Sequence, residues 1–180
     1  MAGLEERLPL LDEILEAWSE PLGDDYEAYR NHVYRVVNFC FALHQPSSAE
    51  RSKIVIAGCF HDLGLWTGGT FDYLPPSVAL AKAYLGANGR DDWIPDVELM
   101  IGLHHKLRTF RDGRFPLVEP FRRADLADFS LGLLRNGVPK AFYRKATSVF
   151  PNAGFHKRLV QLELGWLARH PLRPLPVVKW

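Results

Sequence analysis

The sequence has few of the residues and patterns that mark several common classes of protein. Only two cysteines occur among 180 residues, Cys40 and Cys59, and both lie in apolar segments. No disulfide framework is therefore expected, and a reducing compartment fits best. The net charge is only +1, from 22 basic and 21 acidic residues, which argues against a nucleic-acid polymer as partner. No apolar run can span a bilayer and no signal peptide is visible, so we expect a cytoplasmic protein without membrane contact.

Helical periodicity is the pattern that the sequence does contain. Apolar residues make up 47% and charged residues 24% of the chain, which is ordinary for a soluble globular domain. Apolar side chains recur every three or four residues, and no segment alternates as a strand does. Helices are expected at residues 8–22, 24–44, 48–64, 77–88, 94–107, 119–135, 139–149 and 154–169. We expect an all-α single domain over residues 1–180 with about eight helices. Its core spans about 24–135, and the helices of 139–169 and the proline-rich tail 170–180 pack on it.

His61 and Asp62 stand side by side at the end of the apolar run from Ile54 to Phe60. Such groups are rarely left in an apolar run without a partner. A metal ion satisfies both, because imidazole nitrogen and carboxylate oxygen are good ligands for first-row metals. Ala57 and Gly58, one turn earlier, are small enough to leave room for an ion, and Gly64 is expected to cap the helix.

Two further polar side chains lie on apolar helical faces far from this pair. His32 falls on the apolar stripe of its helix. Asp125 lies one turn after one phenylalanine and one turn before another, so its carboxylate is expected to face the core or a site. The alternative for Asp125 is a surface ion pair with Arg122, three residues earlier. In that case Asp128, one turn further along, would take its place.

Polar residues also follow the apolar helix expected at 94–107. His104 lies on its apolar face and His105 at the edge of that face, so we expect at least one of them to line a pocket. The loop at 65–76 is rich in glycine, proline and aromatic residues, and it is either a lid or a packed connection. Cations can bind phosphate oxygens, and aromatic rings of the loop can shape a pocket. The residues expected to bind substrate are Lys106, Arg122, Trp66 and Tyr73.

The order of these motifs resembles that of the HD-domain superfamily of metal-dependent phosphohydrolases. The resemblance rests on Asn31-His32-Val33, Phe60-His61-Asp62-Leu63-Gly64, His104-His105 and Arg122-Arg123-Ala124-Asp125, which span most of the chain. It implies that His32, His61, Asp62 and Asp125 hold one divalent metal ion: Mn, Fe, Mg, Co, Ni or Zn. Branches with two or three metals carry an extra histidine between the His-Asp pair and the later histidines, which this sequence lacks. A second metal, near His104 and His105, is therefore less expected.

The resemblance also implies a reaction. A metal-activated water would attack the phosphorus of a small phosphorylated metabolite or nucleotide. Asp62, His104 and His105 would be the catalytic residues, with a protonated histidine as acid to the leaving oxygen. An iron-dependent HD-type oxygenase or lyase is the alternative, and a non-catalytic scaffold that binds a ligand is the second alternative. A small phosphorylated molecule is the expected partner, and the sequence leaves a homodimer open.

Overall fold

The computed structural model describes residues 3–170 and residue 177. Within these residues the chain is all-α, as the sequence predicts, and contains no strand. The first half holds α1 (Pro9–Glu16), α2 (Ser19–Leu22), η1 (Gly23–Asp25), α3 (Tyr26–His44), α4 (Ser48–Phe60) and α5 (Gly64–Thr67). The second half holds α6 (Leu74–Ala87), η2 (Asp91–Trp93), α7 (Ile94–Leu103), α8 (Val118–Phe129), α9 (Lys140–Val149) and α10 (Phe155–Arg169).

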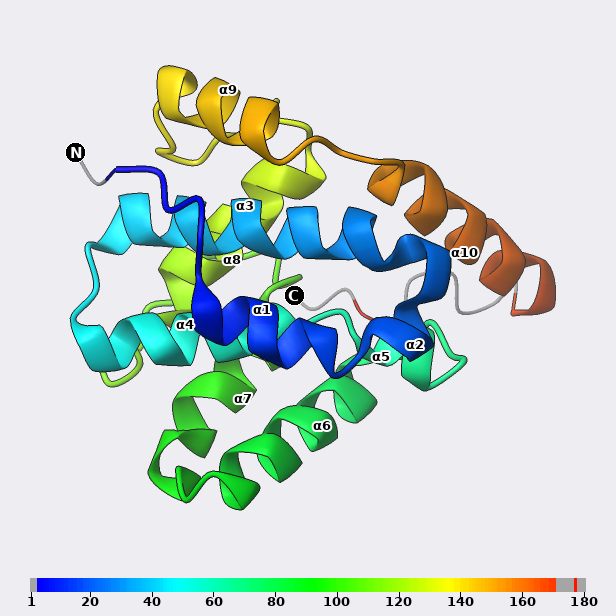
Figure 1. Ribbon diagram of the computed structural model, residues 1–180, viewed down its shortest axis with the longest axis horizontal. Coiled ribbons are helices and arrows are strands. Elements are labelled where there is room, and N and C mark those ends of the chain that lie inside the picture. Colours follow the sequence, from blue (N-terminus) through cyan, green and yellow to red (C-terminus); the bar gives the residue numbers. More distant parts are fainter. Residues whose placement is uncertain (1–2, 171–176, 178–180) are drawn as a thin grey trace.

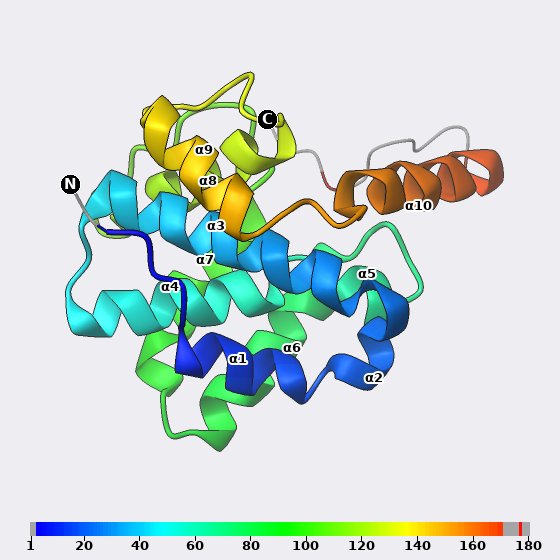
Figure 2. The ribbon, with the colours of Figure 1, turned by 45° about the horizontal axis from the view of Figure 1, so that its top comes forward.

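Helix α3 is the centre of the fold (Figure 1). It packs against α4, α8 and α9, and α4 packs in turn against α1 and α7. Helices α6 and α7 form a neighbouring pair, and α10 extends to one side of the bundle (Figure 2). Almost every residue from Ala28 to Phe41 in α3 is buried, and so is all of Ile54–Phe60 in α4. The apolar run that precedes His61 and Asp62 is therefore fully buried.

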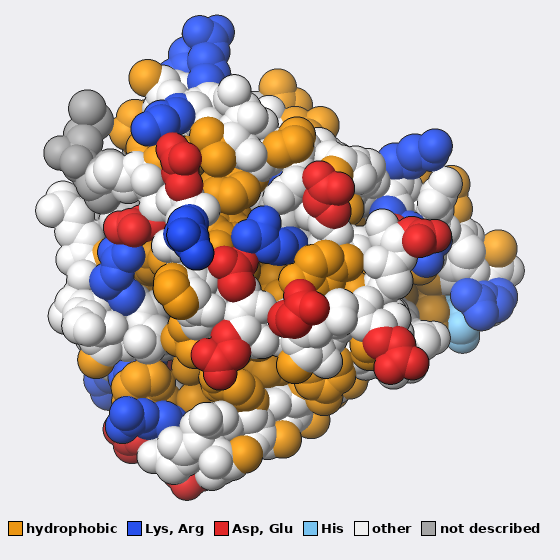
Figure 3. All heavy atoms as spheres, in the orientation of Figure 1, with side chains coloured by type: hydrophobic (Ala, Val, Ile, Leu, Met, Phe, Trp, Pro, Cys, Tyr) orange, Lys and Arg blue, Asp and Glu red, His pale blue; other side chains and the backbone are white. Residues whose placement is uncertain are grey.

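The surface carries mixed charge. Acidic and basic side chains are interspersed with apolar ones over the face shown in Figure 3. No helix in the described part of the chain combines the length and the apolar character needed to cross a bilayer.

Local sequence fixes where α4 begins. The hydroxyl of Ser47 accepts a hydrogen bond from the backbone N–H of Glu50, and the Glu50 carboxylate accepts one from the backbone N–H of Ser47 at 2.8 Å. This reciprocal capping satisfies two backbone donors that the first turn would otherwise leave unpaired. It anchors the helix that carries His61 at its other end.

The helix boundaries differ from those expected. The helices predicted at 48–64, 94–107 and 119–135 end early, at Phe60, Leu103 and Phe129. The helix predicted at 8–22 is interrupted after Glu16 and resumes at Ser19. The loop predicted at 65–76 contains most of α5, and α6 starts earlier than expected, at Leu74. The tail predicted at 170–180 lies outside the described residues, apart from His170 and Val177. The early ends of α4 and α7 place His61 and His104 at helix C-termini.

Gly64 does not cap α4, contrary to the prediction; it is the first residue of α5. Its backbone N–H donates a hydrogen bond to the Ser77 hydroxyl at 2.9 Å. A β-carbon at this position would clash with the backbone oxygen of Tyr73 and lie 2.8 Å from the Ser77 hydroxyl oxygen. Glycine therefore allows α5 to approach the start of α6, and this contact positions Tyr73.

Candidate metal centre

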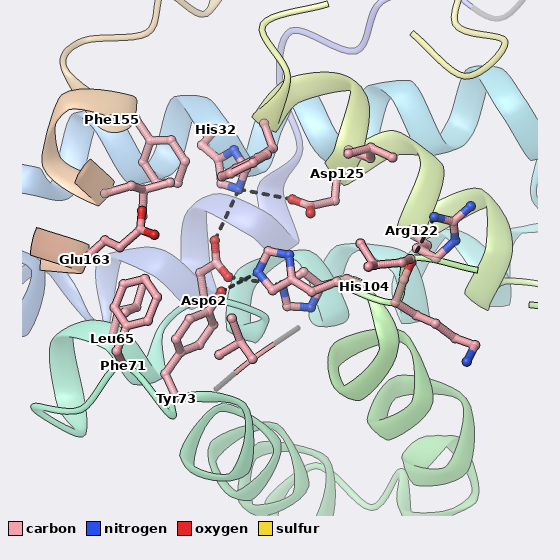
Figure 4. A pocket seen from close by; sticks show the side chains of 17 residues that line it. His32, Asp62, Leu65, Phe71, Tyr73, His104, Arg122, Asp125, Phe155 and Glu163 are labelled. Atoms are coloured by element: carbon pink, nitrogen blue, oxygen red, sulfur yellow. Dashed lines mark hydrogen bonds and ion pairs between the residues drawn. The ribbon is translucent and has the colours of Figure 1, made fainter. Parts of the chain in front are cut away.

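The four side chains expected to bind a metal are buried near one another, and Figure 4 shows three of them, His32, Asp62 and Asp125. His32 projects from the middle of α3, His61 ends α4, Asp62 follows it, and Asp125 lies on α8. The two imidazole Nε2 atoms lie 3.0 Å apart. Oδ2 of Asp62 lies 3.4 Å from His61 Nε2 and 3.6 Å from His32 Nε2. Oδ1 of Asp125 lies 3.5 Å and 3.7 Å from the same two nitrogens. Each of these side chains is at most 5% exposed.

Close packing of α3 on α4 brings His32 to His61. A β-carbon on Gly58 would lie 2.8 Å from a methyl group of Val37 on α3. The absence of a β-carbon at Gly58 therefore allows α3 and α4 to approach, and it does not make room for an ion as the sequence suggested.

Hydrogen bonds on the far side of each ring fix the histidine tautomers. His61 and His104 each donate their Nδ1–H to the backbone carbonyl three residues earlier, at 2.7 Å in both cases. His32 donates its Nδ1–H to Oδ2 of Asp128, also at 2.7 Å. In the neutral form each ring therefore carries an unprotonated Nε2, and these nitrogens point into the cluster. Ligand histidines in metal sites are oriented in this way.

Two unprotonated nitrogens at 3.0 Å need a cation or an extra proton between them. Burial works against the charged form of His32, but its hydrogen bonds to Asp128 and Asp62 raise its pKa to about 9. Burial also opposes ionisation of Asp62, yet the charges of the neighbouring His61 and His104 hold its pKa well below the usual range. The cluster thus stabilises positive charge at its centre, supplied by a proton or by a metal ion.

The ligand separations fit a metal ion. Ligands about 2.1 Å from an ion at angles of about 90° to 120° lie roughly 3.0–3.6 Å from one another. The two imidazole nitrogens lie 3.0 Å apart, and each carboxylate lies 3.4 to 3.7 Å from both of them. His32, His61 and Asp62 form a group of possible ligands whose atoms all lie within 4.8 Å of one another. Two imidazoles and two carboxylates suit Mn, Fe, Co, Ni or Zn, and the carboxylates also suit Mg.

No protein-family model, curated protein or solved structure matches this chain. The nature of the site is therefore inferred from its own geometry and chemistry.

A buried ion pair between Arg35 and Asp128, which was not predicted from the sequence, holds the ring of His32 in place. Arg35, one turn further along α3, donates to both carboxylate oxygens of Asp128, at 2.6 Å and 2.8 Å. Its Nη1 donates to the backbone oxygen of Phe150 at 2.9 Å. Burial opposes ionisation of Asp128, but the hydrogen bond from His32 and the charge of Arg35 lower its pKa below the usual range. Asp128 therefore orients His32 as an ionised carboxylate, and it does not replace Asp125.

The ion pair of Arg35 and Asp128 could have been predicted from the sequence, because each of these charged residues lies on an apolar stripe of its helix. Arg35 lies three residues after His32, and Asp128 three residues after Asp125. The alternative ion pair of Arg122 with Asp125 does not form. Arg122 instead binds both carboxylate oxygens of Glu119, at 2.7 Å and 2.8 Å.

The second oxygen of Asp62 faces a second group of possible ligands. Oδ1 of Asp62 lies 3.3 Å from His104 Nε2, and neither atom has a hydrogen-bond partner within the described structure. Asp62, His104 and His105 each bring one ligand atom within 4.8 Å of the others. The predicted His104-His105 site thus adjoins the first cluster, and Asp62 belongs to both.

Tyr73 fixes the ring of His105. Burial lowers the pKa of His105 to about 4, and burial together with the charge of Asp62 raises the pKa of Tyr73 well above its ordinary value. The phenol therefore keeps its proton, and its oxygen shares a hydrogen bond of 2.6 Å with Nε2 of His105. Burial therefore favours the neutral form of His105.

A cavity of about 310 Å³ opens beside both clusters. Tyr73, Lys106 and Arg122, three of the four residues expected to bind substrate, line it. Trp66 is not among the lining residues: its indole N–H donates to Asp25 at 2.9 Å and its ring packs on Tyr29. Lys106 lies beside Arg122, which donates to its backbone oxygen at 3.0 Å.

Proposed function

We propose that this protein is a metal-dependent phosphohydrolase of the HD-domain type that acts on a small phosphorylated molecule. One observation carries the proposal: histidine nitrogens with fixed tautomers and two carboxylates converge at the floor of a cavity. In the proposal, His32, His61, Asp62 and Asp125 hold one divalent metal ion. A second ion is held by Asp62, His104 and His105, because both oxygens of Asp62 face ligand atoms. From the sequence alone, this second ion is less expected than the first.

The chain's own residues would divide the work as follows. Metal bound in the site supplies Lewis acidity and lowers the pKa of a water molecule. Asp128 and the backbone carbonyls behind His61 and His104 keep the rings oriented. Lys106 brings positive charge to the cavity wall, where it would attract a phosphate group. Most of the charge of Arg122 is balanced by Glu119, so its main task is to hold the backbone at Lys106.

The first test measures metal content and turnover together. Protein loaded with Mn, Co, Mg or Ni is assayed against a panel of phosphate esters, and bound metal is counted by mass spectrometry. The expected result is metal-dependent phosphate release that His61→Ala abolishes together with metal binding. His44→Gln is the matched control, because His44 lies outside the cluster and contacts only the surface residue Glu50. Full metal occupancy without turnover of any ester would count against the hydrolase.

One observation favours a second candidate, an iron-dependent oxygenase or lyase. A carboxylate shared between two ligand groups is suited to a pair of iron ions as well as to hydrolysis. This candidate predicts iron in the purified protein and oxygen consumption with substrate. A non-catalytic scaffold predicts neither turnover nor oxygen consumption.

A further inference from the structure

We propose that the substrate has a hydrophobic body that ends in an amine, and that Glu163 binds this amine as an ammonium group. This inference rests on the proposed function, because it describes the part of the substrate that lies beyond the metal centre. It comes from the side of the cavity formed by α10, which the metal chemistry does not use.

The cavity wall beyond the metal ligands is mainly apolar. Leu65 and Phe71 lie on one side, and Phe155 and Leu159 of α10 on another. Phe155 also stacks on the His32 ring, with centroids 4.0 Å apart and planes 14° apart. An inorganic phosphate would leave this wall uncovered, whereas cavities of roughly 300 Å³ and more usually hold larger organic ligands. The wall therefore favours a substrate with a substantial apolar body.

Glu163 adds one carboxylate to this wall. Phe155, Leu159 and Glu163 follow one another at intervals of four residues, so they share a face of α10, and all three line the cavity. From Phe155, which touches the metal ligand His32, to Glu163 the helix advances by about 12 Å. Figure 4 shows Glu163 and Arg122 on opposite sides of Asp62 and His104. The cavity thus runs from Arg122, past the metal ligands, to the carboxylate of Glu163.

Glu163 has no ion pair or hydrogen bond with any other residue that the structure describes. Without substrate, water can solvate its half-buried carboxylate. A substrate that packs on Leu159 displaces that water, and an ionised carboxylate loses stability unless it gains a donor. An ammonium group restores both the hydrogen bonds and the charge balance. A purely hydrocarbon end would leave the charge unpaired, so the wall selects for an amine.

Phosphonates test this inference, because their carbon–phosphorus bond is not hydrolysed. Alkyl phosphonates and ω-aminoalkyl phosphonates of four, six and eight carbons are titrated calorimetrically into the metal-loaded full-length protein. The aminoalkyl compound of best length should bind roughly tenfold more tightly than its alkyl counterpart, as expected for a charge-assisted hydrogen bond. Glu163→Gln should abolish this difference: the aminoalkyl compound binds more weakly, and the alkyl compound binds more tightly because its hydrocarbon end no longer displaces water from a charged group. Leu159→Ala should weaken both compounds of that length several-fold.

Glu98→Gln is the matched control, since Glu98 pairs with Lys82 at 2.7 Å on the surface and should affect neither probe. Equal binding of alkyl and aminoalkyl phosphonates at every length, or no effect of Glu163→Gln, would overturn the inference. A third series, simple alkylamines without phosphonate, separates this inference from the proposed function. Amine binding that depends on Glu163, with no contribution from the phosphonate, would support the amine site and contradict the phosphohydrolase.

Discussion

Asp128→Asn tests whether the pair of Asp128 and Arg35 holds the candidate metal centre. Asp128 accepts hydrogen bonds from His32 Nδ1 at 2.7 Å and from two nitrogens of Arg35 at 2.6 Å and 2.8 Å. Asparagine keeps the size and one acceptor, but it removes the negative charge and one of the acceptors. The variant therefore perturbs the charge behind His32 without opening a cavity.

The variant should change both the free energy of unfolding and the affinity for metal. The side chains of Arg35 and Asp128 are each 2% exposed, so the variant leaves a buried guanidinium without a counter-charge. Breaking a buried pair in this way costs about 3–5 kcal/mol of the free energy of unfolding. Loss of the residue that orients a ligand histidine lowers metal affinity by about 10- to 100-fold.

Two measurements separate these effects. Urea unfolding followed by circular dichroism, with chelator present, gives the stability of the metal-free protein. Calorimetric titration with Mn²⁺ and Co²⁺ at a temperature where both proteins are folded gives the affinity. The double variant Arg35→Met with Asp128→Asn should recover part of the stability, because no unpaired charge remains, while its metal affinity stays low.

Asp96→Asn is the control for loss of a carboxylate. Asp96 pairs with Lys53 at 2.6 Å, and both side chains are nearly one fifth exposed. We expect a change of about 0–1 kcal/mol and unaltered metal affinity. If Asp128→Asn bound metal as tightly as the wild type, the proposed role of Asp128 in orienting a metal ligand would be refuted.

Three further variants and treatments test the fold around the site. Gly64→Ala should lower the free energy of unfolding by about 1–3 kcal/mol, measured in urea, because its methyl group meets the backbone of the following helix. Ser47→Ala should cost about 1 kcal/mol at pH 7. Hydrogen bonds from Ser47 lower the pKa of Glu50 from 4.5 to about 2, so this cost should be full above pH 4.5. As the pH falls through 2 it should decrease to the part contributed by the bond from the Glu50 backbone N–H to the Ser47 hydroxyl, which does not titrate. Cys40 and Cys59 are buried with raised thiol pKa values, so a thiol reagent should label them only after unfolding.

Helical periodicity was sufficient to predict the all-α fold, because the long helices bury continuous apolar stripes. It did not predict where α4 and α7 end, since residues up to Gly64 and Lys106 continue an acceptable helical pattern. Those ends depend on tertiary contacts, such as the approach of Gly64 to Ser77.

The sequence pattern pointed to His32, His61, Asp62 and Asp125 as candidates, and in the structure each carboxylate lies within 3.7 Å of both imidazole nitrogens. It could not decide between Asp125 and Asp128, which lie one turn apart on the same helix. The two aspartates differ because Arg35, on a different helix, forms an ion pair with Asp128 and not with Asp125. A pairing between two helices cannot be read from either helix alone.

The separation of His32 and Asp128 in the sequence has a consequence for biosynthesis. These two residues are 96 positions apart, and Asp125 lies just before the second of them. A growing chain therefore cannot assemble the complete centre until α8 has left the ribosome and packed on α3. On the proposed function, metal would be acquired late, by a nearly finished fold, and would then favour that fold by mass action. Scarcity of metal in the cell would lower the amount of the protein as well as its activity, because more unliganded chains would be open to proteolysis.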